Sequence, residues 1–191
     1  MPYAQLSADI PFVFGEVQTS KRGQKFAPIT VNERAWQVIE SRKQAVDTWY
    51  LDLSLIRKYW FNERIYHHTA PGPLIYALRE ALRLIQEEGL STRFERHQKC
   101  GDLLKAGLQE LGLELYGDQQ HRLPMLTCVL IGGKGDDVEV RSRLLKEYGI
   151  EIVGGFGPLV GKAWRIGLMG YSCSQRNVNY LLAALGEILE A

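Results

Sequence analysis

The spacing of apolar residues changes near residue 112, and this change constrains the fold more than any other feature. Before it, apolar residues recur at helical spacing, as in Leu74, Leu78, Leu82 and Ile85. After it, short strand patterns interrupt the helical ones, at 113–116, 125–131, 150–153 and 163–169. Helices followed by strand–strand–helix–strand–strand–helix favour an α+β fold. We expect a small mixed or antiparallel sheet with helices packed on one face.

The first 26 residues differ from the rest of the chain. They mix prolines, aromatics and small residues without a period, and they include a basic cluster at 21–25. This pattern predicts an irregular or disordered N-terminal arm at 1–26. Structure begins near Ala27, where Thr30 with Glu33 resembles a capping box and Asn32 competes as the helix cap.

Single residues predict where later helices begin and end. The segment 49–54 is expected to be extended, and Gly89 should end the helix that begins near Pro73. Ser91 should cap the next long helix, whose apolar stripe includes Phe94. Asp136 or Asp137 should start a helix that runs to Tyr148.

Composition excludes several classes of function. Among the 191 residues, 23 Lys and Arg face 22 Asp and Glu, so the net charge is +1 and no basic block marks a nucleic-acid or anionic-membrane surface. No apolar stretch approaches the roughly 20 residues of a membrane span. The three cysteines are widely spaced and form no CxxC pair, which indicates reduced thiols and a cytoplasmic protein.

A loop at 66–69, Tyr-His-His-Thr, precedes Pro71 and a predicted helix that begins near Pro73. Adjacent histidines point in different directions and no acidic or cysteine cluster accompanies them, so we expect no metal site. Tyr66 and Thr69 hydroxyls beside a helix N-terminus could hold an anion. Ordinary loop hydrogen bonding is the alternative.

The strand pattern at 163–169 isolates one charge. Trp164, Ile166 and Leu168 share one face of the strand, so Arg165 projects from the other, beside the open space left by Gly167. A guanidinium in such a place can bind a carboxylate through two parallel hydrogen bonds. A surface salt bridge is the alternative, and the spacing does not separate the two.

The glycine-rich segment 154–161 does not match a nucleotide-binding loop. A phosphate loop needs glycine at 156 and a hydroxyl at 163, where this chain has Phe156 and Ala163. A turn between two strands is expected instead. Ser172 and Cys173 show no catalytic arrangement and are interpreted as turn residues before a helix capped by Ser174.

Five segments occur in one order along the chain: Tyr66–Thr69, Leu78–Leu82, Arg122–Pro124, Ile150–Gly157 and Trp164–Gly170. Together they resemble the C-terminal part of the class V, fold-type I aminotransferases that use pyridoxal phosphate (PLP), especially the alanine–glyoxylate and serine–glyoxylate (serine–pyruvate) group. The resemblance runs from about Ala27 to the C-terminus. It implies linking and interface helices at 27–90 and a small α+β domain at 91–191.

The resemblance also implies roles for three residues. Tyr66 and Thr69 would bind the phosphate of the cofactor held by the partner subunit of a homodimer. Arg165 would bind the carboxylate of the amino acid or 2-oxo acid substrate, in agreement with the face argument. The implied reaction transfers an amino group from alanine or serine to glyoxylate or another 2-oxo acid, with PLP performing the carbanion chemistry.

Much of the family's cofactor machinery has no counterpart in these 191 residues. The large domain, with its ring-stacking aromatic residue and its aspartate, is absent, so the chain alone is expected to lack activity. Lys25 follows Gly23 and Gln24 as the family's cofactor lysine follows its Ser-x-Gln, but the Pro-Pro-Gly stretch that comes next is missing. Lys25 is therefore either a remnant of that site or a solvated charge. A non-catalytic module for dimerisation or partner binding is the alternative function.

Overall fold

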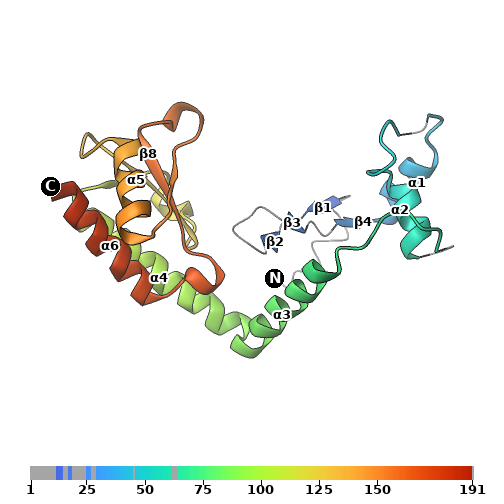
Figure 1. The fold of residues 1–191 in the computed structure, drawn as a ribbon, viewed down its shortest axis with the longest axis horizontal. Helices are drawn as coiled ribbons and strands as arrows, with labels where there is room; N and C mark the ends of the chain where they lie inside the picture. Colours follow the sequence, from blue (N-terminus) through green and yellow to red (C-terminus); the bar gives the residue numbers. More distant parts are fainter. Residues whose placement is uncertain are drawn as a thin grey trace. The chain divides into compact units, whose positions relative to one another are not determined.

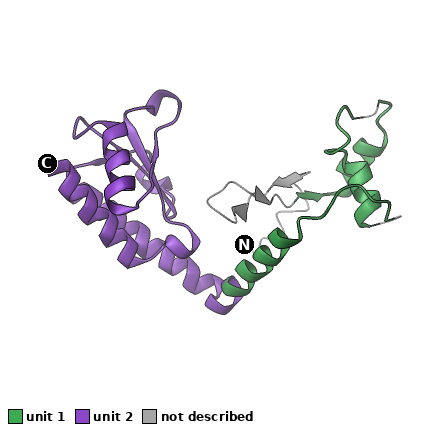
Figure 2. Cartoon of the chain, viewed as in Figure 1, with its two compact units in different colours: residues 1–84 green, residues 85–191 purple. Residues whose placement is uncertain are grey.

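The computed structural model describes residues 12–14, 17–18, 25–26, 29–44, 46–61 and 64–190, with side chains described from residue 29 onward. The chain divides into two compact units, residues 1–84 and 85–191 (Figure 2). The division falls inside helix α3 (Gly72–Glu88). None of the described helices combines the length and the apolar character of a membrane span.

The first unit contains short strands and helices. Its elements before α3 are β1 (Phe12–Phe14), β2 (Val17–Gln18), β3 (Lys25–Phe26), β4 (Ile29–Val31), α1 (Glu33–Glu40) and α2 (Leu53–Trp60). Strand β1 pairs antiparallel with β4, and β2 pairs antiparallel with β3. Most of the arm expected at 1–26 lies outside the described residues.

Side-chain caps start both short helices of this unit. Asn32, not Thr30, caps α1: its Oδ1 accepts the Ala35 N–H at 2.9 Å. Asp52 caps α2 by accepting the Ser54 N–H at 2.8 Å. The extended segment that the sequence predicted around Asp52 is instead a turn, in which the Asp52 N–H donates to the Trp49 carbonyl at 3.3 Å. The capping preference of Asp52 outweighs the strand preference of its aromatic neighbours.

A single glycine separates the two longest helices. Helix α3 ends at Glu88, Gly89 has φ 78°, and α4 (Leu90–Glu110) follows at once. The stop at Gly89 is confirmed, whereas α4 begins earlier than the cap predicted at Ser91 because Gly89 provides the cap position itself.

The second unit contains the four-stranded sheet of the α+β fold, in the order β5-β6-β8-β7 with every pair antiparallel. Its strands are β5 (Glu114–Leu115), β6 (Leu126–Leu130), β7 (Val153–Gly154) and β8 (Ala163–Gly167). Its helices after α4 are α5 (Asp137–Tyr148) and α6 (Gln175–Glu190) (Figure 1). Short 3-10 turns η1 (Gln119–His121), η2 (Gly157–Leu159) and η3 (Gly170–Ser172) connect them.

One face of this sheet is buried under the three helices. Trp164 and Val129 are fully buried and Ile166 is nearly so, and they pack in one cluster with residues of α4, α5 and α6. The alternation predicted for Trp164, Ile166 and Leu168 is confirmed, since all three are buried. Strand β7 is shorter than predicted because the Ile150 N–H caps α5 by donating to the Leu144 carbonyl. The expected layer of helices on one face of a small sheet is confirmed.

Candidate functional site

Two places in the structure hold the residues that the sequence singled out. In the first unit, the loop at 66–69 brings Tyr66 and Thr69 together: the Tyr66 hydroxyl lies 2.9 Å from Thr69 Oγ1. Both residues are exposed, Tyr66 at 69%. The loop ends three residues before α3 begins at Gly72.

The two histidines of the loop have structural partners. His67 is buried, stacks on Trp49 at 4.0 Å between ring centroids, and bonds the Trp49 carbonyl through Nε2 at 2.9 Å. Because a carbonyl only accepts, His67 Nε2 is a donor, which leaves Nδ1 of the neutral ring to accept from His68 Nδ1 at 2.9 Å. These contacts fix the backbone between Tyr66 and Thr69.

The exposed hydroxyl pair fits a phosphate. Only one of the two hydroxyls uses its proton in their mutual bond, so the other can donate to a phosphate oxygen, and none of the described carboxylates bonds to either of them. Tyr66 and Thr69 therefore have the donor chemistry that a cofactor phosphate requires.

The second place is the open face of the sheet in the other unit, where Arg165 is half-buried on β8. Arg165 Nε donates to the Gly154 carbonyl of β7 at 2.9 Å. Within the described part of the chain, no carboxylate forms an ion pair with Arg165, so the surface salt bridge left open by the sequence is not found there. The two Nη groups remain available for an anion.

The surroundings of Arg165 leave room for a ligand. A Cβ placed on Gly167 would meet nothing within 4 Å, as expected for open space on this side. Cys128 of β6 lies directly across from Arg165 in the strand register. Burial raises the pKa of the Cys128 thiol, and the positive charge of Arg165 counteracts part of that rise. Sequence reasoning missed Cys128, because a single strand pattern does not reveal which residues face each other across two strands.

A partly buried network holds the strand that carries Arg165. Trp164 Nε1 donates to Asp137 Oδ1 at 3.0 Å, and Arg141 holds both oxygens of the same carboxylate. The hydrogen bonds from Arg141 keep the pKa of Asp137 below its ordinary value. The N-terminus of α5 is thereby attached to β8.

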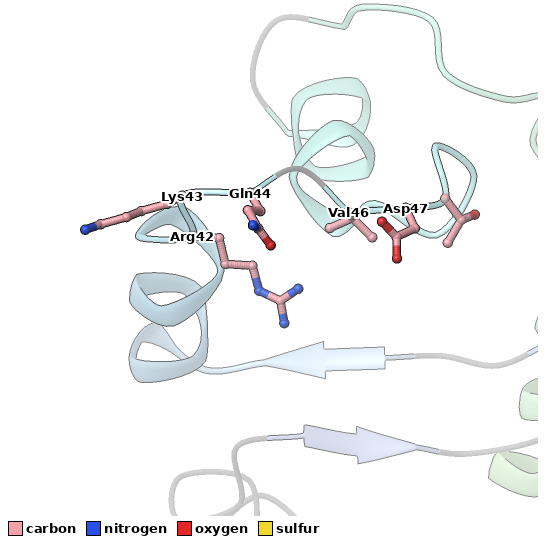
Figure 3. A pocket seen from close by; sticks show the side chains of 6 residues that line it. Arg42, Lys43, Gln44, Val46 and Asp47 are labelled. Atoms are coloured by element: carbon pink, nitrogen blue, oxygen red, sulfur yellow. The ribbon is translucent and has the colours of Figure 1, made fainter.

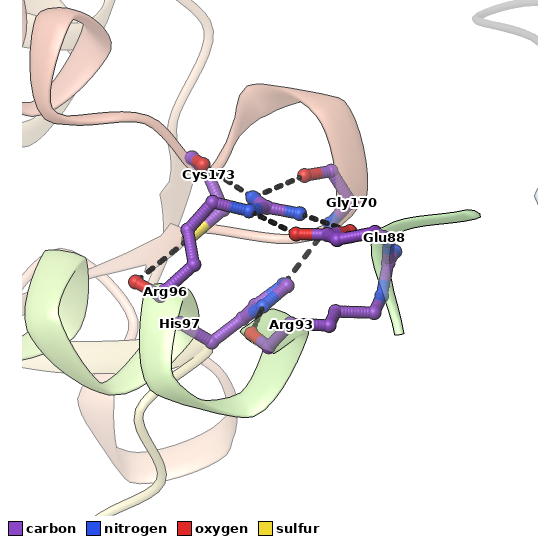
Figure 4. A network of polar contacts seen from close by, with 6 residues as sticks. All are labelled: Glu88, Arg93, Arg96, His97, Gly170 and Cys173. Carbon is purple, nitrogen blue, oxygen red and sulfur yellow. Dashed lines mark hydrogen bonds and ion pairs between the residues drawn. The ribbon is translucent and has the colours of Figure 1, made fainter. Parts of the chain in front are cut away.

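A second network fastens the segment after β8 to α4 (Figure 4). Arg96 bonds Glu88 and also donates to the carbonyls of Gly170 and Cys173. His97 Nδ1 donates to the Arg93 carbonyl at 2.7 Å, and its Nε2 accepts the Gly170 N–H at 3.3 Å. Nothing in the sequence pattern predicted this network, since its partners lie more than 70 residues apart.

Three other features of the chain add no residue to these two places. Lys25 belongs to β3, where it pairs with Gln18, and its side chain lies outside what the structure describes. The described residues contain no group of three or more His, Cys, Asp or Glu that could hold a metal ion. A pocket of about 580 Å³ lies along residues 42–48, between α1 and α2 (Figure 3). All of its lining residues come from that one surface segment, so it brings no separate elements together.

Known proteins resemble this chain over most of its length. The (S)-ureidoglycine–glyoxylate transaminase of Bacillus subtilis is 45% identical over 181 residues, which cover 85% of this chain and 44% of the relative. The alanine–glyoxylate aminotransferase of Drosophila melanogaster is 37% identical, over 86% of this chain and 43% of the relative. No family model matches the chain.

Solved structures agree. The alanine–glyoxylate aminotransferase of a Nostoc species has a TM-score of 0.80 at 47% identity, covering 85% of this chain and 43% of that one. The ureidoglycine–glyoxylate aminotransferase of Bacillus subtilis also has a TM-score of 0.80, at 49% identity, covering 86% of this chain and 42% of that one.

Fold and similarity together define the class: the chain is a partial homologue of the class V, fold-type I aminotransferases, corresponding to their C-terminal portion. The resemblance drawn from the five segments is therefore confirmed. Within that class its similarity lies with the ureidoglycine–glyoxylate and alanine–glyoxylate aminotransferases. The chain spans less than half the length of these relatives.

Proposed function

We propose that this chain is the C-terminal part of a PLP-dependent aminotransferase that transfers an amino group from a small amino acid to glyoxylate or another 2-oxo acid. The observation that carries the proposal is Arg165, a guanidinium on the open face of the sheet with no carboxylate partner among the described residues. The relatives named above are glyoxylate aminotransferases, and both substrates of transamination carry a carboxylate that a guanidinium can bind.

Arg165 would bind and orient the substrate carboxylate. Its Nε bond to the Gly154 carbonyl fixes the plane of the guanidinium, and the space beside Gly167 admits the ligand. Orientation by a fixed planar group favours the reacting geometry more than a mobile lysine could.

Tyr66 and Thr69 would hold the cofactor phosphate of the partner subunit in a homodimer. Their hydroxyls lie 2.9 Å apart and are exposed, as an intersubunit contact requires. When bound, PLP supplies the electron sink that stabilises negative charge on the substrate carbon. The donor is proposed to be alanine or serine, or ureidoglycine as in the name of the Bacillus relative.

Complementation tests the proposal. The chain is combined with a separately produced large domain of a homologous glyoxylate aminotransferase, and glyoxylate-dependent amino transfer is measured. A charge-assisted pair is worth roughly 1.5–3 kcal/mol, so Arg165→Ala should lower kcat/KM by about 10- to 100-fold. Arg165→Lys should recover only part of this loss.

Matched variants separate the two roles. Tyr66→Phe and Thr69→Val should weaken PLP binding, whereas Arg165→Ala should leave the cofactor spectrum intact. Unchanged amino transfer in Arg165→Ala would remove the carboxylate assignment. A folded complex without PLP absorbance would favour the alternative, a non-catalytic module for dimerisation or partner binding.

A further inference from the structure

Two of the three cysteines lie together in the core of the second unit. Cys100 is in the middle of α4 and is 6% exposed, and Cys173 lies just before α6 and is 1% exposed. Both belong to the same buried cluster, and both are free thiols. The proposed aminotransferase function uses neither of them.

Arg96 brings the two thiols to one place. Cys173 Sγ donates to the Arg96 backbone carbonyl at 3.9 Å, and the Arg96 guanidinium binds the Cys173 carbonyl in return (Figure 4). Arg96 precedes Cys100 by four residues, so the two share one face of α4. The Cys100 side chain is one of the groups that raise the pKa of the Cys173 thiol, as expected for two neighbouring thiols.

Cys100 has a route to solvent. It helps to line a pocket of about 570 Å³ between α4 and the start of α6, which Ser174 and Gln175 border on the other side. Burial first, and then the neighbouring Cys100 thiol, raises the pKa of the Cys173 thiol to about 11. Cys173 therefore stays protonated at neutral pH, and Cys100 meets a small oxidant first.

We propose that Cys100 and Cys173 are a redox modification site, at which a hydroperoxide converts the two thiols into a reversible disulfide that joins α4 to the segment before α6. Arg96 and Glu88 hold this segment in place without any covalent bond when the thiols are reduced. The disulfide would replace a polar attachment by a covalent one.

The chemistry balances with a peroxide alone. The Cys100 sulfur, as its thiolate, attacks the peroxide and gives a sulfenic acid, while the cleaved O–O bond leaves one water after protonation. The Cys173 sulfur then attacks the sulfenic sulfur, its proton leaves with the departing hydroxide as a second water, and the S–S bond forms. Two thiols and one molecule of hydrogen peroxide thus give one disulfide and two waters, and two electrons pass from sulfur to oxygen; with an organic hydroperoxide, an alcohol takes the place of the first water.

The test uses the whole chain with Cys128→Ser, which removes the third cysteine on the opposite face of the sheet. Folded protein is treated with hydrogen peroxide, free thiols are counted, and non-reduced peptides are mapped by mass spectrometry. We expect loss of both thiols, a peptide that links Cys100 to Cys173, and recovery of both thiols with dithiothreitol. The rate of disulfide formation should not depend on protein concentration, because the bond forms within one chain.

A stability measurement supplies a second readout. Closing a long loop should raise the Tm of the oxidised form by about 10 °C, and dithiothreitol should reverse the increase. Cys100→Ala and Cys173→Ala, each with Cys128→Ser, are the controls and should form no intramolecular bond. Two free thiols after prolonged treatment, a disulfide between chains, or sulfinic acid at Cys100 without a linked peptide would each overturn the proposal.

Discussion

Arg165 shows how the neighbours of one residue set the position of its charge. Backbone alternation turns its side chain away from the core, and the bond to the Gly154 carbonyl fixes Nε without neutralising the charge. The same charge acts on Cys128, its neighbour across the strands. The Cys128 thiol therefore reports on Arg165 even without substrate.

The first prediction uses this thiol. Alkylation requires the thiolate, and Arg165 lowers the pKa of Cys128 against the effect of burial. Arg165→Met keeps a long side chain but removes the charge, so alkylation of Cys128 by iodoacetamide at pH 8 should slow severalfold. Arg165→Lys, which keeps the charge, is the control and should react at a rate close to that of the wild type. Equal rates for the Met variant and the wild type would show that Arg165 does not influence Cys128.

The second prediction concerns two glycines of the same region. A Cβ on Gly155 would lie 1.9 Å from the Leu159 carbonyl oxygen, so backbone must move. Gly155→Ala should lower the free energy of unfolding by about 2 kcal/mol or more. A Cβ on Gly167 meets nothing, so Gly167→Ala is the matched control and should be nearly neutral in a denaturant titration. A neutral Gly155→Ala would mean that the 154–161 turn can rearrange.

At the scale of elements, the end of α3 is joined to α4 by charge. Glu88 pairs with Arg96 and Arg93, and the hydrogen bond from Arg96 is the main reason that its pKa falls from 4.5 to about 2. A carboxyl with a lowered pKa in the folded state stabilises the fold fully above its unfolded pKa. That contribution is lost as the pH falls from about 4.5 to about 2.

The third prediction concerns how the contribution of Glu88 to stability changes with pH. Glu88→Gln should be less stable than the wild type near pH 6, and the difference should shrink as the pH is lowered through 4 and 3. Urea titrations at each pH measure it. Glu147→Gln, which breaks the more exposed Arg143 pair, is the control and should change stability less. A difference that is constant with pH would show that the Glu88 pair does not stabilise the fold.

The sequence predicted elements well where one residue decides the structure locally. Gly89 ended α3, Asp136 capped α5 as one of two candidates, and alternation placed Arg165 opposite Trp164. Predictions were less accurate where contacts distant in sequence decide. Phe94 was assigned to the buried stripe of α4 and is 55% exposed, whereas His97 is buried because Gly170 packs against it.

The candidate site divides in the same way. Tyr66 and Thr69 lie close in sequence, so their pairing needs only a loop. Cys128 beside Arg165 needs a strand register, and Cys100 beside Cys173 needs a helix and a turn brought together across the fold. A pattern within one short segment cannot predict that residues so far apart in the sequence become neighbours.

For the whole molecule, the fourth prediction is that the isolated chain folds but does not bind PLP tightly. The relatives are about twice as long, and the family resemblance places most cofactor contacts outside these residues. Absorbance and thermal shift with added PLP should show weak binding. Stoichiometric attachment at Lys25 that survives borohydride reduction would contradict this and would identify Lys25 as the cofactor lysine.

The fifth prediction is that the chain self-associates. Large apolar side chains of the first unit are strongly exposed, including Trp49, Tyr50, Leu51 and Phe61 at 57%, 61%, 64% and 81%. Sedimentation velocity over a wide concentration range should show dimers or larger species. Phe61→Ser should reduce association, and Leu145→Ser, which removes an exposed apolar residue from the second unit, is the control. A monomer at every concentration would rule the prediction out.

The short outer strands of the sheet limit how copies of the second unit can associate through their backbones. Strands β5 and β7 border the four-stranded sheet, and each has only two residues. An edge of this length offers few unpaired backbone groups as a template for another chain. Assemblies of this unit should therefore form through side chains, dissociate on dilution, and remain invisible to dyes that report amyloid fibrils.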